Sequence, residues 1–168
     1  MASDTLNYAP ASESEGLTAF LDMQRDALIR KIEGVTDDDA RSAPTASSLS
    51  LLGILKHCAL WERRWFQIIF AGRTFPGEWP ASGKRDWRAA DFEVGSDDTV
   101  LYWLAYYRDQ VDESRRIVAD SELDAPCAMD GEEDRNLRWV LLHHIEEVAR
   151  HAGHADIIRE TIDGATGQ

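Results

Sequence analysis

The sequence predicts an all-α protein that folds as a four-helix bundle. Apolar residues recur at helical spacing in four long segments, at about 12–34, 48–72, 98–119 and 136–162. The chain shows neither a convincing strand period nor an internal repeat. Proline and glycine gather between the segments, and the connections between helices two and three and between helices three and four are long. Such connections suit a bundle whose topology is not simple up-down-up-down.

The first helix begins at Ser12 or Ser14, since either hydroxyl can cap it and glutamates follow in the first turn. It ends at Gly34, and residues 35–47 are polar and are interpreted as a connection. Its apolar stripe consists of Leu17, Phe20, Leu21, Leu28 and Ile32.

The second helix begins at Ser48 or Ser50, runs to Gly72 and is dense in large apolar residues. His57 lies in the middle of its apolar stripe. A polar side chain at such a position needs a partner, which is either another helix or a ligand.

Residues 73–97 contain several helix-breaking residues and also four aromatic residues: Phe75, Trp79, Trp87 and Phe92. Long loops with something to bury are more often functional or packed than disordered. We therefore expect this loop to lie over the bundle and to wall a pocket.

The third helix spans about 98–119, with Asp97 or Asp98 as its cap. Its buried side is expected to consist of Val100, Leu101, Leu104, Tyr107, Val111 and Ile117. A polar loop at 120–135 leads to the fourth helix, at about 136–162.

The composition fits one domain, which we place at residues 14–164 behind a flexible arm at 1–13. The net charge of −13 argues against nucleic acid and anionic membranes as partners. No apolar run is long enough to span a bilayer, and the N-terminus lacks the apolar core of a signal peptide. We expect a cytoplasmic protein with Cys58 and Cys127 as reduced thiols.

Three polar residues of the fourth helix, Glu147, His151 and His154, share the apolar, core-facing stripe. Unpaired buried charge is costly, and a divalent metal would satisfy these groups. His57 of the second helix is the remaining candidate ligand. Two histidines and one carboxylate suit zinc, iron, nickel or manganese. Core histidines that are satisfied by hydrogen bonds alone remain the alternative, because a Glu and a His four residues apart often occur on a helix by chance.

The other polar and aromatic residues have plainer interpretations. His143 and His144 could line a pocket but are more simply interpreted as bundle-lining or surface histidines, and Glu62 is expected to form a surface or interhelix ion pair. Cys58 is interpreted as a core thiol. Core positions are also the prediction for four tryptophans, Trp61, Trp65, Trp103 and Trp139.

Two motifs carry a resemblance to a known family. Leu52 to His57 reads L-x-x-x-x-H, and Glu147 to Asp156 reads E-x-A-R-H-x-G-H-x-D. The chain resembles the DinB/YfiT superfamily of metal-binding four-helix bundles from about residue 14 to 164. Glu147 stands where most members have a histidine. This makes the chain similar to the N-terminal, zinc-binding domain of mycothiol-dependent maleylpyruvate isomerases.

The resemblance implies a metal, expected to be zinc, on His57, Glu147 and His151. His154 is either a fourth ligand or a group that orients Glu147 or the bound water, and the second role is favoured because the family has glutamine there. Arg150 could support the site in the same way, pair with a substrate carboxylate or form an ion pair within the bundle. The resemblance also implies a thiol-dependent S-transferase that uses mycothiol as co-substrate and a small electrophile as substrate. The catalytic group would be the metal-bound water or thiol, with no further catalytic residue assigned.

Isomerisation itself is not expected, because the isomerases carry a further C-terminal domain and this chain ends at residue 168. Two rival hypotheses stay open: a non-catalytic metal-binding or stress-response protein, and a metal-free interaction bundle. A homodimer that forms through the bundle faces is a further expectation from the superfamily.

Overall fold

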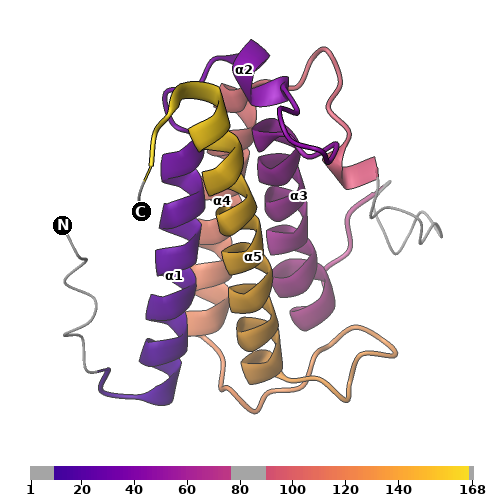
Figure 1. Cartoon of the computed structure of the whole chain (residues 1–168). Coiled ribbons are helices and arrows are strands. Elements are labelled where there is room, and N and C mark those ends of the chain that lie inside the picture. Colours follow the sequence, from indigo (N-terminus) through magenta and orange to yellow (C-terminus); the bar gives the residue numbers. More distant parts are fainter. Residues whose placement is uncertain (1–9, 77–89, 167–168) are drawn as a thin grey trace.

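Four long helices form a bundle in the computed structural model, which describes residues 10–76 and 90–166 (Figure 1). These helices are α1 (Glu13–Ile32), α3 (Leu51–Arg63), α4 (Val100–Ala119) and α5 (Leu137–Asp163). The shorter elements are α2 (Asp37–Arg41), the π-helix η2 (Arg64–Phe70) that continues α3, and the 3-10 helix η3 (Ala90–Phe92). The described residues contain no strand, so the predicted all-α bundle is confirmed.

Helices α1 and α5 run parallel to each other along the bundle (Figure 1). Glu13 pairs with Arg138 near the start of both helices, and Lys31 pairs with Asp156 towards their ends. Both helices bury apolar residues against the same core.

Helices α3 and α4 form the second parallel pair, which runs opposite to the first. Lys56 bonds to Asp98 at one end of this pair, and Gln67 of η2 bonds to Gln110 further along. Two parallel neighbours need a connection that returns along the bundle. The long segment between η2 and α4 meets this need, so the topology differs from up-down-up-down, as the sequence predicts.

Polar caps define where the long helices begin. The Ser12 hydroxyl accepts from the Glu15 amide, and the Ser50 hydroxyl accepts from the Gly53 amide. The Asn136 side chain accepts from the Trp139 amide at the start of α5. These starts agree with the sequence prediction because a side-chain oxygen satisfies amides that have no partner inside the helix.

The prediction was wrong about the cap of α4 and about the connection before α3. Thr99, not Asp97 or Asp98, caps α4. The Asp98 carboxylate instead accepts from the Trp103 indole at 2.7 Å and from Lys56 at 3.1 Å. Within residues 35–47, helix α2 forms behind its cap Thr36.

Three residues predicted to lie in the core are exposed, and Trp139, at 38%, is the least exposed of them. Phe20 is 58% exposed and Leu101 is 81% exposed, whereas their chain neighbours Leu21 and Val100 are buried. Each residue turns the helix by about 100°, so where only one stripe of a helix is covered, the residue beside a buried one points away from the core even if it is equally apolar. Trp103, two residues after Leu101 on α4, is buried as predicted.

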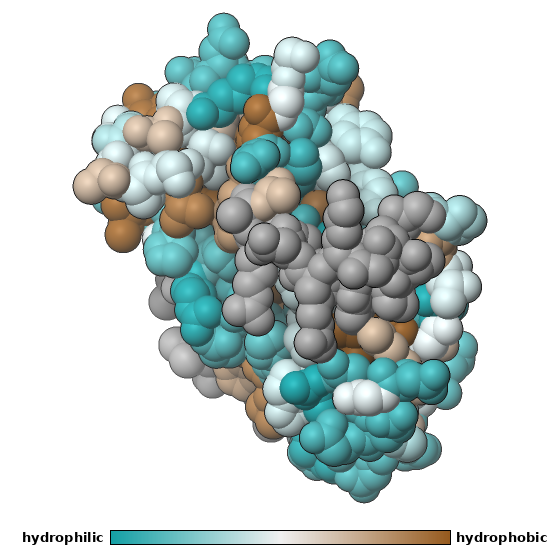
Figure 2. Space-filling model, turned by 90° about the vertical axis from the view of Figure 1, so that its right-hand side faces the viewer, coloured by the Kyte–Doolittle hydropathy of each residue, from teal (hydrophilic) through white to brown (hydrophobic). Residues whose placement is uncertain are grey.

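Figure 2 shows the molecule from the right-hand side of Figure 1, and this face is mainly hydrophilic. Hydrophobic groups on this face form small, separate areas. Among the described residues, no helix has both the length and the apolar character to cross a membrane.

Candidate metal centre

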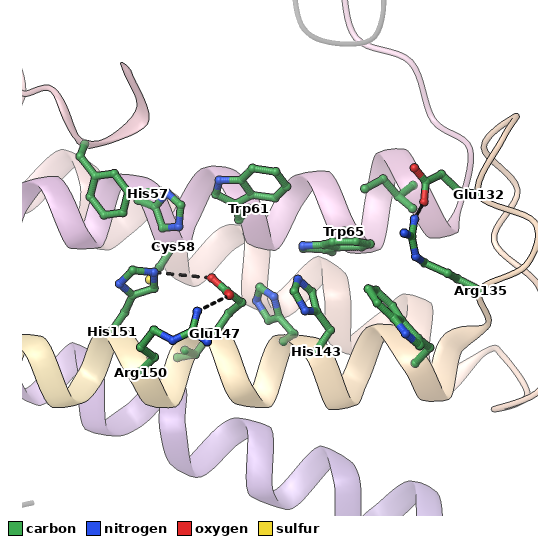
Figure 3. A pocket seen from close by; sticks show the side chains of 15 residues that line it. His57, Cys58, Trp61, Trp65, Glu132, Arg135, His143, Glu147, Arg150 and His151 are labelled. Atoms are coloured by element: carbon green, nitrogen blue, oxygen red, sulfur yellow. Dashed lines mark hydrogen bonds and ion pairs between the residues drawn. The ribbon is translucent and has the colours of Figure 1, made fainter. Parts of the chain in front are cut away.

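The three predicted ligands meet between α3 and α5, although His57 precedes Glu147 by 90 residues in the sequence (Figure 3). One donor atom from each of His57, Glu147 and His151 lies within 4.8 Å of the other two. The His57 and His151 ring centroids are 4.7 Å apart. On α5, the His151 Nε2 atom lies 3.6 Å from a Glu147 carboxylate oxygen. These distances match a group of donors that one ion could bridge with small rotamer adjustments.

Both histidines are held in the neutral form. Burial lowers the pKa of His57 to about 3, with His151 and Arg64 adding to the effect. Burial also lowers the pKa of His151 to about 4, helped by His154 and Arg150. Imidazole binds a metal through a deprotonated ring nitrogen, so both side chains are ready as ligands at neutral pH.

Each of these histidines also has an unsatisfied nitrogen. The Nδ1 atoms of His57 and His151 are buried and have no hydrogen-bond partner within the described parts of the chain. Buried polar atoms without partners are uncommon in folded proteins and point to a ligand or water. The donor set, its neutrality and its unsatisfied atoms therefore fit a divalent metal.

The two groups predicted to support the site lie beside it on α5. Arg150 donates to a Glu147 carboxylate oxygen at 2.8 Å and also pairs with Glu146. The His154 ring lies 5.8 Å from the His151 ring, centroid to centroid. Arg150 therefore contacts a ligand directly, whereas His154 only neighbours one.

A cavity of about 790 Å³ extends from this cluster along the groove between α3 and α5 (Figure 3). The three candidate ligands lie at one end, and Trp65, Glu132 and Arg135 lie towards the other. Its walls mix aromatic and aliphatic side chains with four histidines and four charged residues, so polar groups converge on a partly apolar surface, as they do in small-molecule sites.

The segment before α4 closes the cavity over His57. The Phe92 ring stacks on the His57 imidazole, with centroids 4.1 Å apart and planes inclined by 14°. Gly53 allows this approach, because a Cβ atom there would lie 2.6 Å from the Phe92 carbonyl oxygen. Asp91 is ion-paired with Arg64, which fixes the segment further.

This wall agrees with the predicted role of the aromatic loop at 73–97. Phe92 lines the cavity, and Phe75 lies over the Arg63 guanidinium at 3.7 Å. Trp79 and Trp87 lie outside the described residues.

Three of the tryptophans predicted as core residues line the cavity: Trp65 is also buried in the core, Trp61 is partly buried against it, and Trp139 is exposed. The Trp65 and Trp139 rings are 5.2 Å apart, and His143 stacks on Trp139 at 4.9 Å. Only Trp103 is in the core away from the cavity. Periodicity places these rings on inward faces but does not distinguish a packed core from a cavity wall.

A fully buried ionic network lies behind the cavity wall. Glu62 of α3 accepts from the Arg25 Nε atom of α1 at 3.2 Å and contacts His144 Nε2 of α5 at 2.8 Å. Glu62 was predicted to form either a surface or an interhelix ion pair, and the pair is interhelix. Arg25 was missed, although its position is in register with Leu21, Leu28 and Ile32 on the apolar stripe of α1.

The two cysteines are buried free thiols. Burial raises the pKa of both Cys58 and Cys127 above the ordinary value of a thiol. Since the thiolate is the reactive form, neither cysteine is suited to act as a nucleophile. Cys58 is the core thiol that the sequence predicts, at the edge of the cavity.

Comparison with known proteins places this geometry in a family. No curated protein matches the chain. A crystal structure of a conserved protein from Enterococcus faecalis is similar in fold, with a TM-score of 0.66 and 13% identity, and the match covers 93% of this chain and 100% of that one. The family model described as Mycothiol-S-transferase matches residues 16–164. This match spans most of the sequence, and the chain belongs to the mycothiol S-transferase family.

Proposed function

We propose that this protein is a metal-dependent S-transferase that joins the sulfur of mycothiol to a small electrophile. The observation that carries the proposal is the meeting of His57, Glu147 and His151 at one end of a cavity large enough for two small reactants. Membership of the mycothiol S-transferase family supports mycothiol as the thiol.

Zinc is the proposed ion. Two imidazole nitrogens and one carboxylate oxygen are three protein ligands, a number typical of catalytic zinc sites that keep a position open. Iron, nickel and manganese accept the same donor types. The pKa of a thiol falls beside a bound divalent cation, and this is the chemistry that the ion would supply.

The chain's own residues would hold and shield the reactants. The aromatic walls formed by Phe92, Trp61 and Trp65 exclude water from the cavity and offer flat apolar surfaces to the electrophile. Arg150 donates to the Glu147 carboxylate from the α5 side, whereas Trp61 lies on the other side of that carboxylate (Figure 3). A reduced thiol co-substrate suits the cytoplasm, which we propose as the site of action.

The experiment is a thiol-transfer assay on zinc-loaded protein with mycothiol and 1-chloro-2,4-dinitrobenzene. We expect formation of the dinitrophenyl thioether, with loss of the reaction after treatment with a chelator. Stoichiometric zinc without any acceleration of thioether formation would contradict the proposal and favour a non-catalytic metal-binding protein.

Adjacent carboxylates on α5 give a matched pair of variants. Both Glu146 and Glu147 pair with Arg150, but only Glu147 lines the cavity. We expect Glu147→Gln to lose bound zinc and thioether formation, while Glu146→Gln keeps both. Equal zinc loss in both variants would overturn the assignment of Glu147 as the ligand.

A further inference from the structure

The Arg25–Glu62–His144 network is deeply buried, and its His144 side chain lines the cavity. Glu62 is completely buried, and His144 and Arg25 are 1% and 2% exposed. One carboxylate therefore ties together three helices, with Arg25 from α1, Glu62 from α3 and His144 from α5. Burial of a charged pair is a weak source of stability, so a network of this kind invites a search for another role.

The network determines which nitrogen of His144 carries the proton. Burial acts to raise the pKa of Glu62, but Arg25 and His144 outweigh it and hold the pKa at about 2. Glu62 is therefore ionised and can only accept, so the His144 Nε2 atom must donate to it. In the neutral ring, Nδ1 is then a bare acceptor.

That acceptor is unused by the described residues. The His144 Nδ1 atom is buried and has no hydrogen-bond partner among them. His144 also lines the cavity that holds the candidate metal ligands, and it precedes Glu147 by one turn of α5. The arrangement of carboxylate, imidazole and free ring nitrogen is that of a positioned general base.

We propose that His144 accepts the thiol proton of the co-substrate through Nδ1, with Glu62 fixing its tautomer and orientation. This inference rests on the proposed S-transferase function. The thiol S–H bond breaks, the proton binds Nδ1, and the sulfur keeps the electron pair. The sulfur then forms a bond to the electrophilic carbon, whose leaving group departs with its own bonding pair. His144 returns its proton to solvent.

The electrostatics suit this transfer. Before the step, Arg25 is paired with both Glu62 and Asp22, so carboxylate charge is available to stabilise a cationic His144 ring. After it, the imidazolium faces the Glu62 carboxylate on one side and the new thiolate in the cavity on the other. His143 also lines the cavity, but the carboxylates within 4.8 Å of it, Glu146 and Glu147, are already paired with Arg150.

Nitrogen NMR of histidine-labelled, zinc-loaded protein tests the proton transfer without turnover. In wild-type protein we expect the His144 Nδ1 signal to be that of an unprotonated nitrogen, and to become that of a protonated nitrogen when mycothiol is added. A signal that is protonated before mycothiol binds, or unprotonated afterwards, would overturn the proposal.

Calorimetry supplies the second measurement, with mycothiol titrated into zinc-loaded protein in buffers of different ionisation enthalpy. His144→Gln is the informative variant because its amide can still donate to Glu62 but provides no base. We expect almost no proton release on binding to wild-type protein and about one proton released to buffer per thiol bound to the variant. The same count in both proteins would contradict the role of His144.

Tyr107→Phe is the matched control. Tyr107 is also fully buried and its hydroxyl has no hydrogen-bond partner among the described residues, but it does not line the cavity. We expect it to behave as wild type in proton release and rate, whereas His144→Gln keeps its zinc and loses about 100- to 10,000-fold in rate at saturating mycothiol.

The outcomes distinguish this inference from the proposed function. If wild-type protein neither binds mycothiol nor forms the thioether, both proposals fail together. If wild-type protein is active and His144→Gln retains its rate and proton count, only the role of His144 fails.

Discussion

Neutral imidazoles separate the candidate metal centre from an ordinary cluster of polar residues. Burial keeps His57 and His151 uncharged, while the Glu147 carboxylate approaches His151 on the same helix. Two neutral imidazoles and one carboxylate would neutralise only part of the charge of a divalent cation. The remaining positive charge would attract the thiolate of the proposed reaction.

His57 is the only one of the three candidate ligands that comes from α3. We expect His57→Ala to lose stoichiometric zinc, because loss of even a group that only orients a ligand costs about 10–100-fold in affinity. Metal analysis of freshly purified, untagged protein is the measurement. Full zinc occupancy together with unchanged melting would exclude the site.

Gly53 permits the contact between η3 and α3. Alanine there gains about 1 kcal/mol in helix propensity but costs about 1–3 kcal/mol in overpacking against the Phe92 carbonyl. We expect Gly53→Ala to change stability little, to displace the wall over His57 and to speed zinc removal by a chelator.

Gly153→Ala is the control for that substitution, since a Cβ atom there would meet no atom within 4 Å. We expect the control to be stabilised by up to about 1 kcal/mol, with zinc removal at the wild-type rate. Equal chelation rates in wild-type protein and in Gly53→Ala would show that the wall does not depend on this glycine.

At the scale of helices, the Arg25–Glu62–His144 network fixes α1, α3 and α5 against one another. Removal of one partner from a buried pair leaves an uncompensated charge, so we expect Arg25→Met to lower the free energy of unfolding by about 3–5 kcal/mol. The exposed Arg30 on the same helix is the control, and Arg30→Met should stay within about 0.5 kcal/mol of wild type. Denaturant titration measures both, and similar values for the two variants would contradict this role.

The same network predicts how stability depends on acid. The pKa of Glu62 is about 2 in the folded protein, below the ordinary value of 4.5. Its contribution to stability is therefore complete above about pH 4.5 and is lost as the pH falls towards 2. We expect the free energy of unfolding of wild-type protein to fall more steeply over this window than that of Glu62→Gln, and parallel curves would disprove the assignment.

At the scale of the whole molecule, the bundle consists of two parallel helix pairs, and the candidate site joins them through α3 and α5. A ligand that binds only the folded state at 100 times its Kd stabilises by about 2.7 kcal/mol. For a protein of this size that corresponds to about 5–10 °C in Tm. We expect removal of zinc by a chelator to lower Tm by this amount, as measured by calorimetry, and an unchanged Tm would argue that no ion joins the pairs.

The sequence predicts much of this architecture because its main signals are local. The caps Ser12, Ser50 and Asn136 and the spacing of Glu147 and His151 depend on helix geometry alone. His57 is a candidate from its place on the apolar stripe of its own helix, and the family resemblance selects it together with those two as the ligand set. Periodicity says that a residue faces inward but not what it meets there.

That limit explains the residues whose roles emerged only from the structure. Arg25 carries its charge on an apolar stripe, and its partner Glu62 lies on another helix. Trp65 and Trp139 line a cavity, although Trp65 also packs in the core. Each case depends on packing between segments that are far apart in the chain.

The close approach at Gly53 also has a genetic consequence. Every other amino acid carries a Cβ atom at this position. The nearest atom that it would meet is the Phe92 backbone carbonyl oxygen, which cannot rotate away as a side chain can. Substitutions that keep the backbone N–H therefore share one primary lesion, displacement of the Phe92 backbone, whereas proline would also remove the amide that donates to the Ser50 hydroxyl. A saturation library at this single codon would act as a graded opening of the wall above His57.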